Sequence, residues 1–142
     1  MEATEIIHCR GHPLVLGSHP TTFEITREDH LTQNGNCIVG IAADKGSAGL
    51  SRAFREVLSH DEAILTTLLA CAGVSAEITS HGSSLMALAR PADLVWRRSS
   101  FVCGRTIGIL SDHVAATLPK KLIEKLVLGE EMVATLTARR RG

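Results

Sequence analysis

One stretch of the chain occurs twice, and this repetition constrains the fold more than any other feature of the sequence. Residues 39–71 align without a gap onto residues 107–139 at a constant shift of 68 positions, and eleven of the 33 aligned positions are identical. Unrelated segments of this length would share roughly two or three identities, so the pattern predicts an internal duplication. The identical pairs are Gly40/Gly108, Ile41/Ile109, Asp44/Asp112, Ala48/Ala116, Leu50/Leu118, Glu56/Glu124, Leu58/Leu126, Glu62/Glu130, Thr67/Thr135, Leu68/Leu136 and Ala70/Ala138.

The length of the chain limits how the two copies are arranged. A chain of 142 residues has the size of one domain and can bury a core without disulfides or metal. We therefore predict a single domain over residues 1–142 whose halves share one core. The halves cover about residues 1–71 and 75–138, and residues 139–142 form a basic tail.

Hydrophobic periodicity predicts one helix and a closing strand in each half. Leu50, Ala53, Phe54, Val57 and Leu58 recur with the spacing of one apolar helix face. The matching segment of the second half begins with a proline, which suits a first helical turn. The segment 132–138 alternates branched and small residues and predicts a strand, so its counterpart 64–70 is interpreted as a strand too.

These elements predict an α+β fold with two halves related by a pseudo-twofold axis. Each half consists of several strands, one helix and a closing strand. The strands of both halves form one shared sheet. We expect this sheet to be mainly antiparallel and barrel-like, with the two helices packed on it. Such a chain could also form a homodimer through its edge strands.

Cysteine usage and hydropathy predict a cytoplasmic protein. The four cysteines, Cys9, Cys37, Cys71 and Cys103, never form a C-x-x-C pair, which is typical of reduced and mostly buried thiols. The longest stretch without charge, residues 63–76, is too short and too polar to span a membrane. The acidic start of the chain does not resemble a secretory signal.

Three stretches carry a resemblance to a known family. They are GHPLVLGSHPTTFEIT (residues 11–26), LTQNGNCIVGIAADKG (31–46) and RRSSFVCGRT (97–106). With these stretches the chain resembles an uncharacterised archaeal family, the domain of unknown function numbered 371. The resemblance implies an archaeal cytosolic protein and carries no established activity.

Two duplicated aspartates are the first candidates for a site. Asp44 with Lys45, and Asp112 with His113, each follow an apolar strand. A carboxylate beside a basic side chain at a strand end can bind a ligand or transfer protons. The alternative is that each aspartate accepts backbone N–H bonds in its loop, and the symmetric repetition favours that structural role.

The loop after Asp44 and two histidines complete the predicted ligand-binding set. Gly46 and Gly49 lie between a strand and a helix, where backbone N–H groups could approach a phosphate. The loop lacks a complete P-loop or dinucleotide motif. His12 and His19 flank a short predicted strand, and their spacing matches no zinc pattern. The sequence assigns no catalytic residue, cofactor or metal site.

Two functions of different classes remain open. The first is a protein that binds, and possibly acts on, a small anionic ligand at His12, His19, Asp44, Lys45, Gly46, Gly49, Asp112 and His113. The second is a non-catalytic module that contacts RNA or a protein through the basic second half. Residues 1–71 carry five Lys/Arg against nine Asp/Glu, and residues 72–142 carry ten against six. Aromatic side chains for base stacking are scarce, which disfavours the RNA module.

Overall fold

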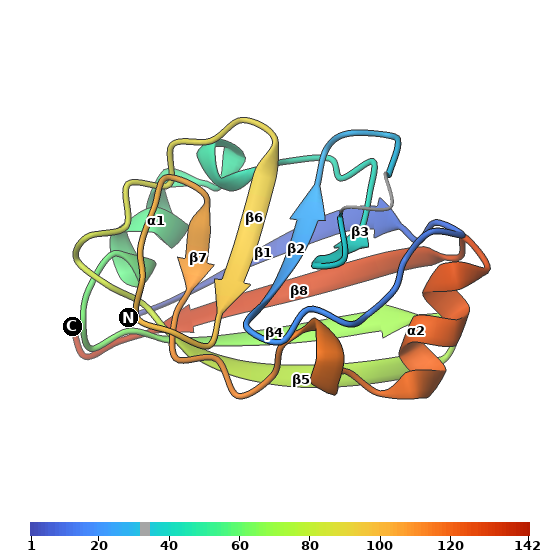
Figure 1. Ribbon diagram of the computed structural model, residues 1–142. Coiled ribbons are helices and arrows are strands. Elements are labelled where there is room, and N and C mark those ends of the chain that lie inside the picture. The colour runs from blue at the N-terminus through green and yellow to red at the C-terminus, as the bar shows by residue number, and fades with distance from the viewer. Residues whose placement is uncertain (32–34) are drawn as a thin grey trace.

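The computed structural model of the protein describes residues 1–31 and 35–142 and contains two four-stranded sheets with a helix near each end (Figure 1). The elements in chain order are β1 (Glu2–Arg10), β2 (Thr22–Thr26), β3 (Ile38–Gly40), the 3₁₀ turn η1 (Ser47–Gly49), α1 (Arg52–Leu58), β4 (Ile64–Cys71), β5 (Val74–His81), β6 (Asp93–Arg97), β7 (Thr106–Gly108), the 3₁₀ turn η2 (Ala115–Thr117), α2 (Lys120–Val127) and β8 (Glu131–Arg139).

The larger sheet, here called sheet A, has the strand order β1-β8-β4-β5 and is antiparallel throughout. Its strands alternate buried and exposed residues, as expected when only one face of a sheet is covered. The covered face presents Ile7, Leu65, Leu69 and Leu136 to the core, and each of these side chains is fully buried. Both segments predicted as closing strands, 64–70 and 132–138, are confirmed as β4 and β8.

The smaller sheet, sheet B, has the order β3-β2-β6-β7 and lies across the covered face of sheet A (Figure 1). Its centre is the antiparallel pair β2 and β6, and each edge strand pairs in parallel with its neighbour. Phe23 and Trp96 stack at 4.4 Å between ring centroids. The indole N–H of Trp96 donates to the hydroxyl of Thr67 on β4 at 2.9 Å. This bond satisfies both buried polar groups and joins the two sheets.

The predicted barrel-like shared sheet is wrong. In the described part of the chain, backbone pairing between the two sheet regions is limited to single bridges, between Arg10 and Ile41 at one edge and between His81 and Ile109 at the other. β3 and β7 are three residues long, so neither can continue a ladder around the molecule. The barrel therefore does not close, and the core lies between two sheets. The α+β class is confirmed.

The two predicted helices are confirmed and begin and end within two residues of the predicted pattern. The hydroxyl of Ser51 caps α1 by accepting from the backbone N–H of Phe54 at 3.2 Å, a bond that satisfies an otherwise free donor of the first turn. Phe54 on α1 and Leu122 on α2 are fully buried against the ends of the sheets. α1 and α2 lie at opposite ends of sheet A (Figure 1).

The order of elements is the same in both halves, but the gapless alignment fails in the closing strands. Thr67 is fully buried whereas Thr135, its aligned counterpart, is half-buried. Leu68 is 40% exposed whereas Leu136 is fully buried. Five residues connect α1 to β4 and three connect α2 to β8. The two strands are therefore one residue out of phase with the alignment, which places the aligned side chains on opposite faces. The identities in β4 and β8 are not structurally equivalent.

The chain termini lie together beside α1 (Figure 1). Arg139, predicted as the start of a basic tail, is the last residue of β8 and its Nε lies 2.8 Å from Glu2 Oε1. The amino group of Met1 donates to the carbonyl of Arg140 at 2.7 Å.

Candidate functional site

Asp44 and Asp112 each tie a loop to an edge strand of sheet A. Asp44 Oδ1 accepts the backbone N–H of His8 at 3.1 Å, and the Asp44 N–H donates to the carbonyl of His8 at 3.0 Å. Asp112 makes the same two bonds with Thr79, at 2.9 and 3.0 Å. Each aspartate thereby continues the pairing of an edge strand. This role is structural, but the N–H partner lies in the edge strand and not, as expected, in the aspartate's own loop.

The two aspartate loops do not converge. His8 belongs to β1 and Thr79 to β5, and these strands are the two opposite edges of sheet A. The predicted ligand-binding residues therefore divide into separate groups. Asp44, Lys45, Gly46 and Gly49 lie by the β1 edge, whereas Asp112 and His113 lie by the β5 edge.

The residues after Asp44 make contacts within the fold. Lys45 Nζ lies 3.0 Å from Oε2 of the nearly buried Glu5, whose Oε1 accepts the backbone N–H of Ser51. Burial opposes ionisation of Glu5, but these partners outweigh it and lower the pKa of its carboxyl. A Cβ at Gly46 would lie 2.4 Å from the carbonyl oxygen of Pro91, so close packing explains this glycine.

Two of the three backbone N–H groups of η1 donate hydrogen bonds within the fold. Ala48 donates to the carbonyl of Arg90 at 2.9 Å, and Gly49 donates to the carbonyl of Gly46 at 3.0 Å. The hydroxyl of Ser47 contacts the carbonyl of Gly104 at 2.9 Å. These bonds dock the loop on the second half of the chain.

The three predicted histidines make local contacts. His12 Nδ1 accepts from the N–H of Leu14 at 3.0 Å, and His113 Nδ1 lies 3.1 Å from the hydroxyl of Thr117. His19 Nδ1 accepts from the N–H of Thr22 at 3.1 Å, which closes the turn before β2. His12 and His19 therefore form no shared site with Asp44.

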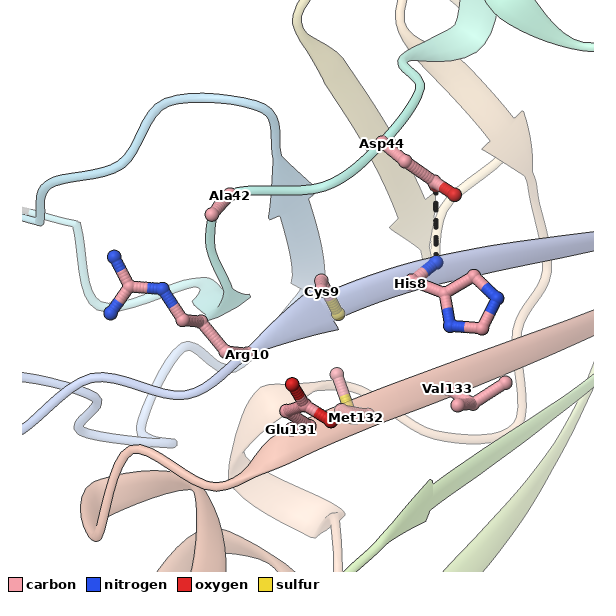
Figure 2. A pocket seen from close by; sticks show the side chains of 8 residues that line it. All are labelled: His8, Cys9, Arg10, Ala42, Asp44, Glu131, Met132 and Val133. Atoms are coloured by element: carbon pink, nitrogen blue, oxygen red, sulfur yellow. Dashed lines mark hydrogen bonds between the residues drawn. The ribbon is translucent and has the colours of Figure 1, made fainter.

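A small pocket adjoins Asp44 over the ends of β1 and β8 (Figure 2). Its volume is about 260 Å³, and the Asp44 carboxylate points to the backbone of His8 at its rim. The pocket contains charges of both signs, from Arg10 and from Asp44 and Glu131, so it does not select for an anion. Its lining residues are His8, Cys9, Arg10, Ala42, Asp44, Glu131, Met132 and Val133.

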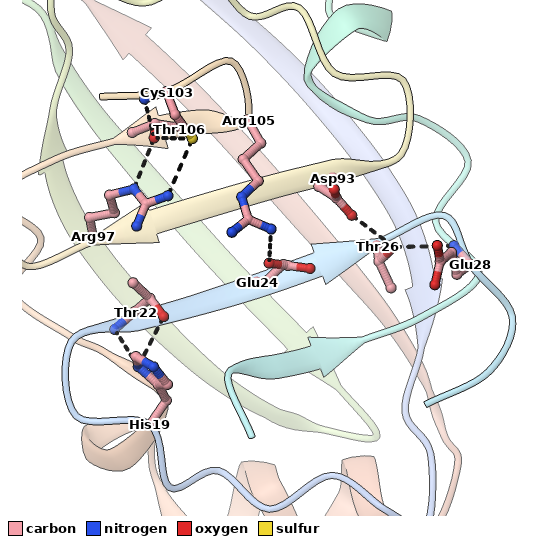
Figure 3. A network of polar contacts seen from close by, with 10 residues as sticks. All are labelled: His19, Thr22, Glu24, Thr26, Glu28, Asp93, Arg97, Cys103, Arg105 and Thr106. Atoms are coloured by element: carbon pink, nitrogen blue, oxygen red, sulfur yellow. Dashed lines mark hydrogen bonds and ion pairs between the residues drawn. The ribbon is translucent and has the colours of Figure 1, made fainter. Parts of the chain in front are cut away.

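A second cluster, which the sequence did not predict as a site, covers the face of sheet B that points away from sheet A (Figure 3). We call it the polar face. Glu24 on β2 and Arg97 on β6 belong to it. Cys103 and Arg105 reach it from the segment before β7, and Thr106 is the first residue of β7. Polar side chains occupy this side of β2 although the whole strand is buried, and buried polar groups need partners. The polar face comprises Thr22, Glu24, Thr26, Asp93, Val95, Arg97, Cys103, Arg105 and Thr106.

Glu24 carries a carboxyl that is only 8% exposed. Its Oε1 lies 3.3 Å from Nη1 of Arg105, which is 43% exposed. Burial and the nearby Asp93 carboxylate raise the pKa of Glu24 to about 7, although Arg105 and Arg97 act in the opposite direction. Near neutral pH this carboxyl can both donate and accept a proton.

Cys103 is held by two donors. Its Sγ lies 3.3 Å from Arg97 Nη2 and 3.5 Å from Thr106 Oγ1, and the thiol is half-buried. Partial burial opposes ionisation, but the Thr106 hydroxyl, the backbone N–H of Arg105 and the Arg97 guanidinium outweigh it and lower the pKa of Cys103 to about 6. Cys103 is therefore largely a thiolate at neutral pH, and a thiolate is the reactive form.

Thr106 fixes the geometry of this pair. Its hydroxyl accepts from Arg97 Nε at 2.9 Å and from the backbone N–H of Cys103 at 3.0 Å. Because Thr106 is fully buried, its position is set by the fold. The guanidinium of Arg97 also lies 4.9 Å from the ring centroid of Phe101, which restricts the side chain further.

The sequence contained one signal for this site. Two of the three stretches that carry the family resemblance supply residues of the polar face, including Glu24 from the first and Cys103 from the third. Cys37, from the second stretch, adjoins this face. The carbonyl of Cys37 accepts the backbone N–H of Glu24 at 2.9 Å. From the sequence, the cysteines are expected to be mostly buried thiols. The contact of Cys103 with Arg97 was not predicted, because it depends on how the chain turns between β6 and β7.

Comparison with known proteins decides the family. A family model described as a domain of unknown function, DUF371, matches residues 7–139. The chain belongs to the DUF371 family. An uncharacterised protein of Methanocaldococcus jannaschii is 36% identical to this DUF371 protein over 128 residues, which cover 90% of this chain and 94% of that one. The predicted family resemblance is confirmed.

Among the described residues of this DUF371 protein, no helix has the length and apolar character required to cross a membrane.

Proposed function

We propose that this DUF371 protein binds a small anionic ligand on the polar face and acts on it through Cys103. The observation that carries the proposal is the contact of Cys103 Sγ with the Arg97 guanidinium at 3.3 Å. A guanidinium beside a half-exposed thiol stabilises the thiolate and so prepares a nucleophile. The ligand class is the one expected from the sequence. The proposed site, however, lies on sheet B and not at the aspartate loops.

Arg105 and Glu24 support the choice of an anion. Arg105 is 43% exposed and its neighbour Glu24 has a pKa of about 7. When Glu24 is protonated, the charge of Arg105 is no longer balanced by that carboxylate, and the guanidinium can pair with a carboxylate or phosphate of a ligand. Glu24 could also exchange a proton with the ligand during the reaction.

Paired alkylation reagents test this proposal. Iodoacetate is an anion and iodoacetamide is its neutral counterpart, so their rate ratio at a thiol reports anion attraction. We expect Cys103 to react faster than Cys37 with both reagents, and to favour iodoacetate by about threefold or more over the ratio at Cys37. Peptide mapping by mass spectrometry gives both rates in one sample.

Cys37 is a matched control because it adjoins the same sheet, while burial and the Glu24 charge raise its pKa. Arg105→Gln should remove the preference for iodoacetate at Cys103 and leave the iodoacetamide rate within about twofold. Equal rates at both cysteines would contradict the nucleophile, and an unchanged reagent ratio in Arg105→Gln would contradict the anion site.

We also propose that the two halves arose by duplication. The paired bonds of Asp44 with His8 and of Asp112 with Thr79 support this origin. The left-handed φ values of Ala42 at 54° and Leu110 at 49° support it further. Aligning the halves of many DUF371 sequences, with β4 and β8 offset by one residue, should raise the identity between halves above chance. An absence of this excess would contradict a common origin.

A further inference from the structure

Arg55 fills a socket between α1, η1 and the segment before β6. Its Nε donates to the carbonyl of Leu50 at 3.1 Å, and its Nη2 donates to the carbonyls of Ala48 and Leu88, both at 2.8 Å. Ser47 provides a fourth carbonyl at 3.4 Å. The side chain is half-buried, so the guanidinium satisfies backbone acceptors that the fold would otherwise leave unpaired.

The second half builds the same backbone surroundings around an open pocket. η2 docks through the Ala116 N–H, which donates to the carbonyl of His19 at 3.0 Å, as the Ala48 N–H donates to Arg90 in the first half. Gly17 has a φ of 58°, close to the 50° of Leu88 at the matching place. The pocket has a volume of about 340 Å³. It is lined by Leu16, Gly17, Ala116, Leu118, Lys120, Ile123 and Glu124.

The pocket is open because two residues differ between the halves. Ile123 takes the place of Arg55 and Gly17 takes the place of Leu88. A Cβ on Gly17 would lie 2.8 Å from Cδ1 of Ile123, so Ile123 fills the space that the Leu88 side chain fills in the first half. No side chain of the described residues takes the place of the Arg55 guanidinium.

The acceptors of the socket remain in the second half. The carbonyls of Gly17, Ala116 and Leu118 correspond to those of Leu88, Ala48 and Leu50, which bind Arg55. Among the described residues, none of these three carbonyls accepts a hydrogen bond in the second half. Each of the three residues lines the pocket. Because the matching carbonyls of the first half converge on one guanidinium, we expect these three to converge on the pocket.

We propose that this pocket binds an alkyl guanidinium group, as a free small molecule or as the arginine side chain of a partner peptide. Convergent backbone carbonyls match the planar fork of guanidinium donors better than a point charge. Leu16 and Ile123 offer apolar contact to the alkyl stem. At the rim, Glu124 adds a carboxylate that attracts a cation and Lys120 has the opposite charge, so the preference for a guanidinium over other cations comes from the carbonyls. This site is separate from the polar face and does not depend on the function proposed there.

Titration of the full chain with butylguanidinium tests the inference, with the methyl resonances of Ile123 as the readout. Butylurea, which is planar but neutral, and butylammonium, which is charged but not planar, are the matched probes. We expect butylguanidinium to shift the Ile123 methyl signals and to bind at least about tenfold more tightly than either control. Equal affinity of the three probes, or no shift with any of them, would overturn the proposal.

A variant that fills the socket from within gives an independent test. Ile123→Arg should form the bonds that Arg55 makes, raise the melting temperature and abolish butylguanidinium binding, whereas Ile123→Leu should still bind the probe. In both variants the methyl resonances of Leu16, which also lines the pocket, report binding. If Ile123→Arg does not fold, Glu124→Gln serves instead and should weaken binding through loss of the rim carboxylate. Binding that survives unchanged in a folded Ile123→Arg variant would place the probe elsewhere and overturn the assignment.

The same readout separates the two sources of the group. N-acetyl-arginine-N-methylamide presents the side chain with a peptide backbone on both sides. Tighter binding of this compound than of butylguanidinium supports a peptide partner, whereas weaker binding supports a free guanidine. If neither compound binds, the inference that this pocket binds a guanidinium group is rejected.

Discussion

Arg97 and Cys103 are in contact, with 3.3 Å between Nη2 and Sγ, and the proposed reactivity of the thiol depends on this contact. Arg97→Gln removes the positive charge beside the sulfur and should raise the pKa of Cys103 from about 6 toward its ordinary value of 9.0. The pH dependence of the iodoacetamide rate at Cys103 measures this change. Arg98→Gln removes the neighbouring charge and should leave the midpoint in place, and a midpoint near 9 in the unmodified protein would contradict the assignment.

The raised pKa of Glu24 predicts that the protein becomes less stable as the pH rises through neutrality. Its pKa rises from 4.5 in the unfolded chain to about 7 in the folded protein. The unfolded state therefore loses its proton first as pH rises. The stability contribution of the neutral carboxyl is present in full below pH 4.5 and is lost as pH rises through about 7. From this residue alone, unfolding free energy should fall by roughly 2–3 kcal/mol between pH 4.5 and 8.

Glu24→Gln tests that linkage because it keeps the shape and removes the titration. The variant should be more stable than the unmodified protein at pH 8, with a smaller difference at pH 5, as measured by urea unfolding. Glu28→Gln is the control, because it makes the same substitution at a nearby side chain that is 60% exposed. An identical pH slope in the unmodified protein and in Glu24→Gln would contradict the raised pKa.

Sequence patterns predicted the local elements of this fold more fully than their assembly. The apolar period from Leu50 to Leu58 and the alternation from Met132 to Ala138 depend on neighbours in the chain, and both elements formed as expected. The division into two sheets depends on how far β3 and β7 extend, which is set by tertiary contacts. The one-residue offset between β4 and β8 depends on the lengths of the linkers after the helices. A shift of one residue in a strand moves each side chain to the opposite face of the sheet.

The site was harder to predict for the same reason. Asp44 and Asp112 are candidate ligand-binding residues in the sequence because they are duplicated. In the structure, the bonds of each aspartate to an edge strand account for its position. Glu24 is distant from Arg97 and Cys103 in the chain and reaches them through the β2–β6 pair, whereas Cys103 approaches Arg97 through the turn between β6 and β7. No sequence pattern marks a carboxyl as buried or a thiol as activated. The state of Glu24 depends on neighbours across the sheet, and that of Cys103 depends on how the segment from Arg97 to Thr106 folds.

The aspartates should therefore act on stability and not on reactivity at the polar face. Asp44→Ala and Asp112→Ala should each lower the unfolding free energy by about 1–2 kcal/mol through loss of a carboxylate to backbone N–H bond. Asp29→Ala, at an 84% exposed side chain, should change it by less than about 0.5 kcal/mol. Alkylation of Cys103 should stay within about twofold in all three variants. A large loss of Cys103 reactivity in Asp44→Ala alone would contradict this and indicate that Asp44 belongs to the reactive site.

Gly46 and Gly49 distinguish close packing from phosphate binding in the η1 loop. A Cβ at Gly46 would lie 2.4 Å from the backbone oxygen of Pro91, whereas at Gly49 the nearest atom is Lys45 Cβ at 3.0 Å. Gly46→Ala should thus destabilise the fold by more than about 2 kcal/mol and Gly49→Ala by about 1 kcal/mol or less. Urea unfolding measures both, and addition of inorganic phosphate should leave both values unchanged. Equal stability of the two variants would contradict the packing explanation, and stabilisation by phosphate that Gly46→Ala abolishes would favour a phosphate loop instead.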